Sequence, residues 1–221
     1  MLVETAEKAV KQDFLDLVYG VLFNSAATFR NLADAPPIGQ AVLVLFILTL
    51  SNGIVSFSFF RLTFRDIPGV DPMIAQVLTG IFPVVLILAL VFTGLRWFIS
   101  GAVLHLLAEL LGGRGTPKGT LTVCALAGLP GVFLIPFELL VRLFRVPEIA
   151  AAVLSGLAGV VVLAWGAVLL VIGLREIHRF SSGNAVLTII TPVTVFIIIS
   201  LLVAASVIFA LGTFVPFSRA L

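Results

Sequence analysis

The stretch LLGGRGTPKGTLTV, residues 110–123, interrupts the apolar middle of the chain with a glycine-rich loop that also holds Arg114, Pro117 and Lys118. A loop of this composition can either cradle a phosphate or join two helices. A Walker A loop has the order G-x-x-x-x-G-K-[ST] and lies between a strand and a helix. Here Pro117 precedes the lysine, Gly119 follows it, and the segment before the loop is a long apolar helix. The pattern therefore argues against a P-loop.

The same residues fit a connection between two helices. Gly112 and Gly113 can end the first helix in left-handed backbone geometry. Thr116 can cap the second helix, with Pro117 at its first helical position. The stretch is therefore expected to be a turn between two buried helices.

The composition indicates that these helices lie in a membrane. Of the 221 residues, 61% are hydrophobic and 11% are charged, whereas roughly 25% of the residues of a soluble domain are charged. The N-terminal sequence lacks the basic start and the early apolar core of a signal peptide. Membrane insertion is therefore expected to depend on later segments. The single cysteine, Cys124, excludes an internal disulfide.

The apolar segments predict an all-α, polytopic membrane protein with a bundle of five transmembrane helices. The expected spans are residues 41–60, 74–111, 120–143, 149–174 and 185–211. They form a transmembrane domain over residues 38–221, preceded by an N-terminal segment, residues 1–37.

The second of these regions is longer than the ~20 residues that cross a bilayer, so it is either one long helix or two spans joined by a tight turn. Its only turn candidate, Arg96-Trp97, contains neither Gly nor Pro and suits a membrane interface. We therefore expect one helix, with 74–95 as the main span and 98–111 continuing beyond it.

The basic residues outside the spans favour a cytoplasmic N-terminus. Five spans place the chain ends, before Phe14 and after Phe214, on opposite sides of the membrane. One side then collects seven basic residues, Lys8, Lys11, Arg30, Arg114, Lys118, Arg175 and Arg179, and the other side five, Arg61, Arg65, Arg142, Arg145 and Arg219. The side with more basic residues is expected to be the cytoplasmic one.

The N-terminal segment is predicted to contain an amphipathic interfacial helix over residues 13–32. One face holds Asp13, Asp16, Gly20, Asn24 and Asn31; the opposite face holds Phe14, Leu15, Val18, Val21, Leu22, Phe29 and Leu32. The first 37 residues carry three basic and five acidic side chains, so attraction to anionic lipid does not explain docking. We expect the apolar face to pack on the transmembrane helices, near the basic loop residues Arg114, Lys118, Arg175 and Arg179.

His105 and Glu109 are the candidate intramembrane polar site, because ionisable side chains within a span are costly. They are four residues apart and share one helical face. The pair could be half of a proton or metal site, or a hydrogen-bonded pair that braces two helices. Two side chains are too few for a metal site. His178 could join them, since both loops fall on the same side of a five-span protein.

Other chemistry has little support in the sequence. The H-E-x-x-H and G-x-S-x-G signatures of hydrolases are absent, and there is no basic surface studded with aromatics for nucleic acid. We expect no enzyme activity, no cofactor and no nucleic-acid partner.

Ser155, Gly156 and Gly159 follow the small-xxx-small pattern and predict close packing of the fourth helix.

Three segments together resemble the Yip1-domain membrane proteins in their prokaryotic form. They are LVYGVLFNSAATFRNLADAPPIGQA from residue 17, LLGGRGTPKGTLTVCALAGLP from residue 110, and GLREIHRFSSGNAVLTIITP from residue 173. The resemblance runs from about Phe14 to Phe209. It implies five transmembrane helices, a cytosolic N-terminal part and a location in a prokaryotic plasma membrane. Eukaryotic relatives act in ER–Golgi traffic and associate with Rab GTPases and with each other.

This sequence departs from those relatives. Their tyrosine-rich third-span motif is reduced to VCALAGLP, residues 123–130, without tyrosine, and residues 16–20, DLVYG, only echo their Asp-Leu-Tyr-Gly motif. A Rab-type partner is therefore not carried over. We expect a non-enzymatic protein that binds membrane lipids, other membrane proteins or itself, or that organises the bilayer. The alternative is a small permease or lipid-moving protein with a polar path lined by His105 and Glu109.

Overall fold

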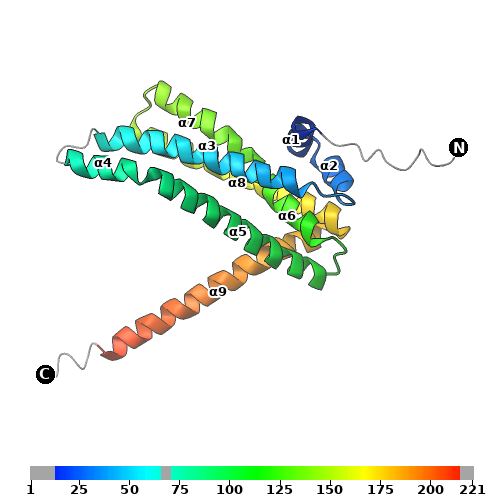
Figure 1. Cartoon of the computed structure of the whole chain (residues 1–221). Helices are drawn as coiled ribbons and strands as arrows, with labels where there is room; N and C mark the ends of the chain where they lie inside the picture. Colours follow the sequence, from blue (N-terminus) through cyan, green and yellow to red (C-terminus); the bar gives the residue numbers. More distant parts are fainter. Residues whose placement is uncertain (1–12, 66–70, 215–221) are drawn as a thin grey trace.

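A computed structural model describes residues 13–65 and 71–214, and in these residues every regular element is a helix (Figure 1). Five helical segments are long and apolar enough to cross a membrane: Ile38–Ser58, Phe82–Leu110, Pro117–Leu143, Glu148–His178 and Ser182–Gly212. The prediction of an all-α protein with five spans is confirmed. The chain ends, whose sides were predicted, lie partly outside the described residues.

Ten helical elements make up the N-terminal segment and the five spans of the described chain. They are α1 (Phe14–Phe23), α2 (Ser25–Leu32), α3 (Ile38–Arg65), α4 (Pro72–Gly80), α5 (Phe82–Leu110), α6 (Pro117–Leu126), the 3₁₀ helix η1 (Leu129–Phe133), α7 (Leu134–Leu143), α8 (Glu148–His178) and α9 (Ser182–Phe214). α6 packs against α3, α5 and α8, so the third span lies at the centre of the bundle. α9 touches α5 and α8 near its start and then runs away from the other helices (Figure 1).

The long second apolar region is one crossing, but it is interrupted. α4 ends at Gly80, Ile81 separates the two helices, and α5 begins at Phe82 and continues onward (Figure 1). Pro83, in the first turn of α5, explains the break, because its ring clashes with the carbonyl four residues earlier and it has no N–H to donate. Trp97 does not mark a helix end: its Nε1–H donates to the carbonyl oxygen of Leu121 in α6, at 2.9 Å.

The predicted single N-terminal helix is divided in two at Asn24. This residue has φ −137° and ψ 51°, outside the helical region, and its N–H donates to the carbonyl oxygen of Gly20 at 2.8 Å. Thr28 lies directly over Gly20, where a Cβ would be 2.5 Å from the Thr28 hydroxyl oxygen. A single helical wheel therefore holds only as far as Phe23.

The predicted docking of this segment on the protein's own helices is confirmed. Phe14, Val18 and Leu22 pack in a cluster with side chains of α6 and α8. The most deeply buried side chains are Leu17, Val21 and Phe29, each 0% exposed. The predicted apolar face was wrong at Leu15, which is exposed, because the buried face is centred on Leu17.

The close packing expected at Ser155, Gly156 and Gly159 of α8 is wrong within this chain. A Cβ built on Gly156 or Gly159 would meet no atom within 4 Å. The helices that do pack on α8 meet it elsewhere: Gly166 lies against the Ala127 carbonyl and Gly173 against Val123. The small-residue face of α8 is open.

Candidate functional site

The glycine loop between α5 and α6 ends one helix and starts the next as predicted. Gly112 has φ +86°, and the N–H groups of Gly112 and Gly113 donate to the carbonyl oxygens of Glu109 and Ala108, at 3.0 and 2.8 Å. This is the Schellman arrangement for the end of a helix. Thr116 then caps α6, because its hydroxyl oxygen accepts from the Gly119 N–H at 3.1 Å.

The other glycines of this loop make room for the end of α8. A Cβ on Gly113 would lie 2.6 Å from Nδ1 of His178, and a Cβ on Gly115 would lie 2.9 Å from the same atom. On Gly119 it would lie 2.7 Å from the Ile177 side chain. The glycine-rich composition therefore reflects the side chains of Ile177 and His178, which come from about 60 residues further along the chain. Sequence reasoning did not find this reason for the glycines.

The structure brings His105, Glu109 and His178 together and adds Thr120 to them. His178 is 0% exposed and His105 is 8% exposed, with their ring centroids 5.5 Å apart. The Thr120 hydroxyl oxygen lies 2.8 Å from His178 Nε2 and 3.3 Å from His105 Nδ1. Thr120 was not among the predicted residues, because a lone threonine at the start of an apolar helix resembles a capping residue.

The hydrogen bond from Gly115 sets the tautomer of His178. The Gly115 N–H donates to His178 Nδ1 at 3.2 Å, so His178 carries its proton on Nε2 and donates to Thr120. The Thr120 hydroxyl can then donate to His105 Nδ1, or to the Thr116 carbonyl, also 3.3 Å away.

The same assignment extends to the surface. When Thr120 donates to His105 Nδ1, the His105 proton lies on Nε2, which is 3.3 Å from the Glu109 carboxylate. The Glu109 side chain is 55% exposed. All four ring nitrogens lie within hydrogen-bond distance of a partner in the protein. The cluster is thus a complete hydrogen-bonded brace between α5, α6 and α8.

Metal binding has no support at this cluster. Within residues 13–65 and 71–214, no group of three or more His, Cys, Asp or Glu side chains is placed to hold a metal ion. The ring nitrogens that could bind one are already used in hydrogen bonds.

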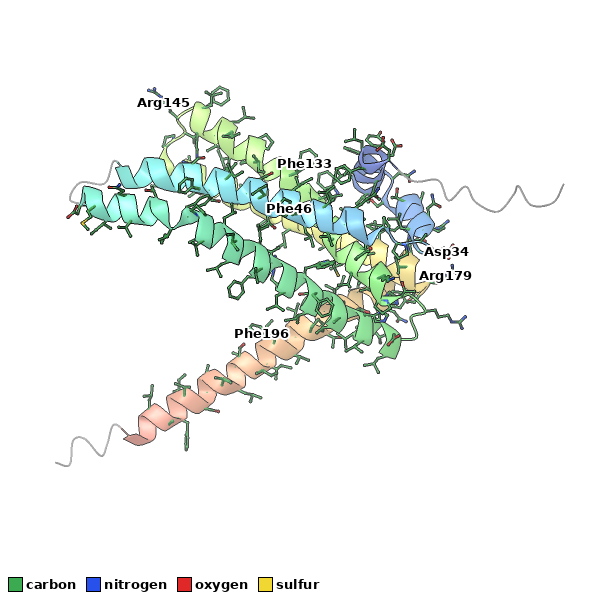
Figure 2. All side chains as sticks on the ribbon, viewed as in Figure 1. Asp34, Phe46, Phe133, Arg145, Arg179 and Phe196 are labelled. Carbon is green, nitrogen blue, oxygen red and sulfur yellow. The ribbon has the colours of Figure 1, made fainter. Side chains whose placement is uncertain are left out.

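The four predicted basic loop residues divide into two pairs. Arg175 and Arg179 lie in the ion-pair network that joins the N-terminal segment to α8: Arg30 and Arg175 both bind Glu176, and Arg179 binds Asp34 at 2.9 Å. These five side chains line a cleft of about 450 Å³, and Figure 2 labels Asp34 and Arg179 close together at this end of the bundle.

Among the described residues, Arg114 and Lys118 form no ion pair with the acidic side chains of the N-terminal segment. Both are exposed, and Arg114 instead uses its backbone N–H, which donates to the His178 carbonyl oxygen at 3.0 Å. Asp13 and Asp16 are exposed, and the other two acidic residues before α1, Glu4 and Glu7, lie outside the described residues.

Replacing His105 by glutamine is expected to leave the fold intact and to cost about 1 kcal/mol or less, since polar contacts between membrane helices are typically that weak. The glutamine amide keeps a polar group beside Thr120. Chemical unfolding in detergent micelles measures the change. A loss of several kcal/mol would contradict the small energetic role given to this contact.

Five apolar crossings, a buried hydrogen-bonded brace and a docked N-terminal segment define a polytopic helical membrane protein. A family model, the Yip1 domain, matches residues 19–214. The chain therefore belongs to the Yip1-domain family. No curated protein and no solved structure matches the chain.

Proposed function

We propose that this protein is a non-enzymatic membrane component that binds other membrane-embedded proteins through helices that its own bundle leaves uncovered. The observation that carries the proposal is the exposure of α9. Every large apolar side chain described from Val193 to Leu211 is exposed by 48% or more. A helix packed in a bundle buries one face, whereas this part of α9 buries none. The open face at Gly156 and Gly159 of α8 is a second surface on which another helix could pack closely.

The brace at His105 argues against the permease alternative. A polar path requires groups that can exchange protons or ligands along its length. Here the hydrogen-bonded chain runs from Glu109 through His105, Thr120 and His178, and it ends at the backbone N–H of Gly115. A backbone amide does not pass a proton onward. We therefore expect no pH-dependent flux across liposomes that contain the protein. A flux that His105→Gln abolishes would contradict this expectation.

Photo-crosslinking in native membranes tests partner binding. A photoreactive residue at Ile208 of α9, 71% exposed, is expected to give discrete protein adducts. The same residue at Leu143 of α7, 74% exposed, is the matched control and is expected to give lipid adducts only. Lipid adducts alone from both positions would overturn partner binding and favour a role in organising the bilayer.

We further propose that the N-terminal side of the bundle faces the cytoplasm and that the membrane is a prokaryotic plasma membrane. The basic loop residues at the ends of α5 and α8 support this orientation. In a Cys124→Ala background, a cysteine at the exposed Asn31 is expected to be labelled only from the cytoplasm, and one at Glu148 only from outside. Labelling of both cysteines from one side would contradict the five-span topology.

A further inference from the structure

Arg96 is a charged residue at an unusual place in this protein. It is the middle residue of α5, a helix otherwise apolar for most of its length, and its side chain is exposed. Among the described residues, it has no hydrogen-bond or ion-pair partner. An ionised side chain inside the hydrocarbon is costly and usually indicates a partner.

The packing of α3 on α5 gives the depth of Arg96. A Cβ on Gly53 would meet the Leu86 side chain, and the rings of Phe57 and Phe82 stack with centroids 3.6 Å apart. In antiparallel helices, each step backward in α3 corresponds to a step forward in α5. Extending the two contacts in this way places Ile38, where the first span begins, at the level of Gly101. Arg96 then lies about five residues deeper, or ~7 Å at ~1.5 Å per residue. We infer from this register that Arg96 lies in the upper part of the hydrocarbon, close to the headgroup boundary on the N-terminal side.

An apolar groove begins one turn after Arg96 on α5, at Ile99 and Ser100. It has a volume of about 440 Å³ and lies between α5 and α9; its lining includes Ile99, Ser100 and Val103 of α5 and Pro192, Val193 and Phe196 of α9. Arg96 is three and four residues before Ile99 and Ser100, so the three share one face of α5. Figure 2 labels Phe196 on α9 in the region where this helix crosses α5.

We propose that this groove binds one phospholipid, with its phosphate at Arg96 and the Ser100 hydroxyl and with part of an acyl chain between α5 and α9. A guanidinium is suited to phosphate, to which it can donate two parallel hydrogen bonds. The apolar lining suits hydrocarbon, and Ser100 supplies the single polar side chain of the lining. The groove uses Val193 and Phe196 near the start of α9 and leaves the later part of this helix, which contains Ile208, to the proposed protein partner.

A second copy of this chain fits the site less well. α3 and α9 contain no acidic residue, and the only one in α5 is Glu109, more than three turns away from Arg96. A copy that placed any of these helices in the groove would bring apolar surface but no countercharge at the depth of Arg96. A phospholipid brings both the anionic group and the hydrocarbon.

Lipid binding by the purified full-length protein tests the proposal. Phosphatidylglycerol is titrated into protein stripped of lipid in neutral detergent, and bound lipid is counted by native mass spectrometry. Arg96→Gln is expected to weaken binding of the first lipid about tenfold or more, because it removes the charge-assisted hydrogen bonds from the guanidinium to the phosphate. Arg96→Lys is expected to weaken it less. Arg114→Gln makes the same charge change at an exposed loop position and is expected to have no effect.

Two further arms separate the possible outcomes. Val193→Trp fills the groove without changing charge and is expected to weaken lipid binding, with thermal unfolding in detergent used to confirm that the variant is folded. Inorganic phosphate is not expected to compete, because it has no acyl chain for the groove; effective competition would identify a free-phosphate site instead. Equal lipid retention by the Arg96→Gln and Arg114→Gln variants would overturn the proposal. The proposal would also be overturned if Arg96→Gln abolished a crosslink to a protein and left lipid binding unchanged. That result would assign Arg96 to an acidic partner helix.

Discussion

Gly113→Ala is expected to destabilise the bundle by about 3 kcal/mol, at the upper end of the usual cost of overpacking a core. The added Cβ would lie 2.6 Å from His178 Nδ1 and 2.8 Å from the Ala108 carbonyl oxygen. The second of these contacts is with backbone, so a change of side-chain rotamer cannot relieve it. Either the α5 end or the loop must shift, and a shift breaks the bond from Gly115 to His178.

Two other glycines provide controls for this substitution. Gly112→Ala meets no atom within 4 Å but has φ +86°, so it isolates backbone strain, expected to cost about 1–2 kcal/mol. Gly39→Ala, near the start of α3, also meets no atom within 4 Å and has no positive φ; it is expected to be neutral or slightly stabilising. Chemical unfolding in detergent micelles gives all three values. If Gly113→Ala costs no more than Gly112→Ala, the loop does not close on His178 as described.

His178→Ala is also expected to lower the free energy of unfolding by about 3 kcal/mol, within the range for large-to-small changes in a core. The substitution empties a fully buried site and leaves the Gly115 N–H and the Thr120 hydroxyl without their imidazole partner. Buried polar groups left without a partner are themselves costly.

Glu109→Gln is the matched control for this second change, because it alters the exposed end of the same hydrogen-bonded chain. Its expected effect is under about 0.5 kcal/mol, as for other exposed polar positions. The two variants are compared by thermal unfolding in the same detergent. A stability of His178→Ala equal to that of Glu109→Gln would mean that α8 does not brace the loop.

The sequence predicts the five spans well because long apolar segments have few alternatives in a membrane protein. It also predicts the end of α5 and the start of α6, since Gly112, Thr116 and Pro117 act through their own backbone geometry or nearby groups. His105 and Glu109 could be paired for the same reason, being one turn apart. These successes all depend on interactions within a few residues.

The remaining features depend on contacts between distant segments. Nothing in the linear order connects Gly113 with His178, so the reason for the glycines appears only when α8 is in place. The break at Asn24 depends on Thr28 packing over Gly20. The exposure of α9 was also unpredictable, because a face toward lipid and a face toward protein are both apolar in this setting.

The position of His178 has a consequence for how the chain is made. Residues 112–119 leave the ribosome well before His178, whose imidazole packs against them. The hairpin of α5 and α6 therefore enters the membrane while Gly115 and Thr120 still lack this partner. The N-terminal segment also cannot complete its packing until α8 is synthesised, since Phe29 packs against Gly173 of α8. Arrival of the end of α8 therefore completes two separate parts of the bundle at once. Nascent chains stopped before residue 170 are expected to remain sensitive to proteases at both places, and chains extended past α8 are expected to become resistant at both together.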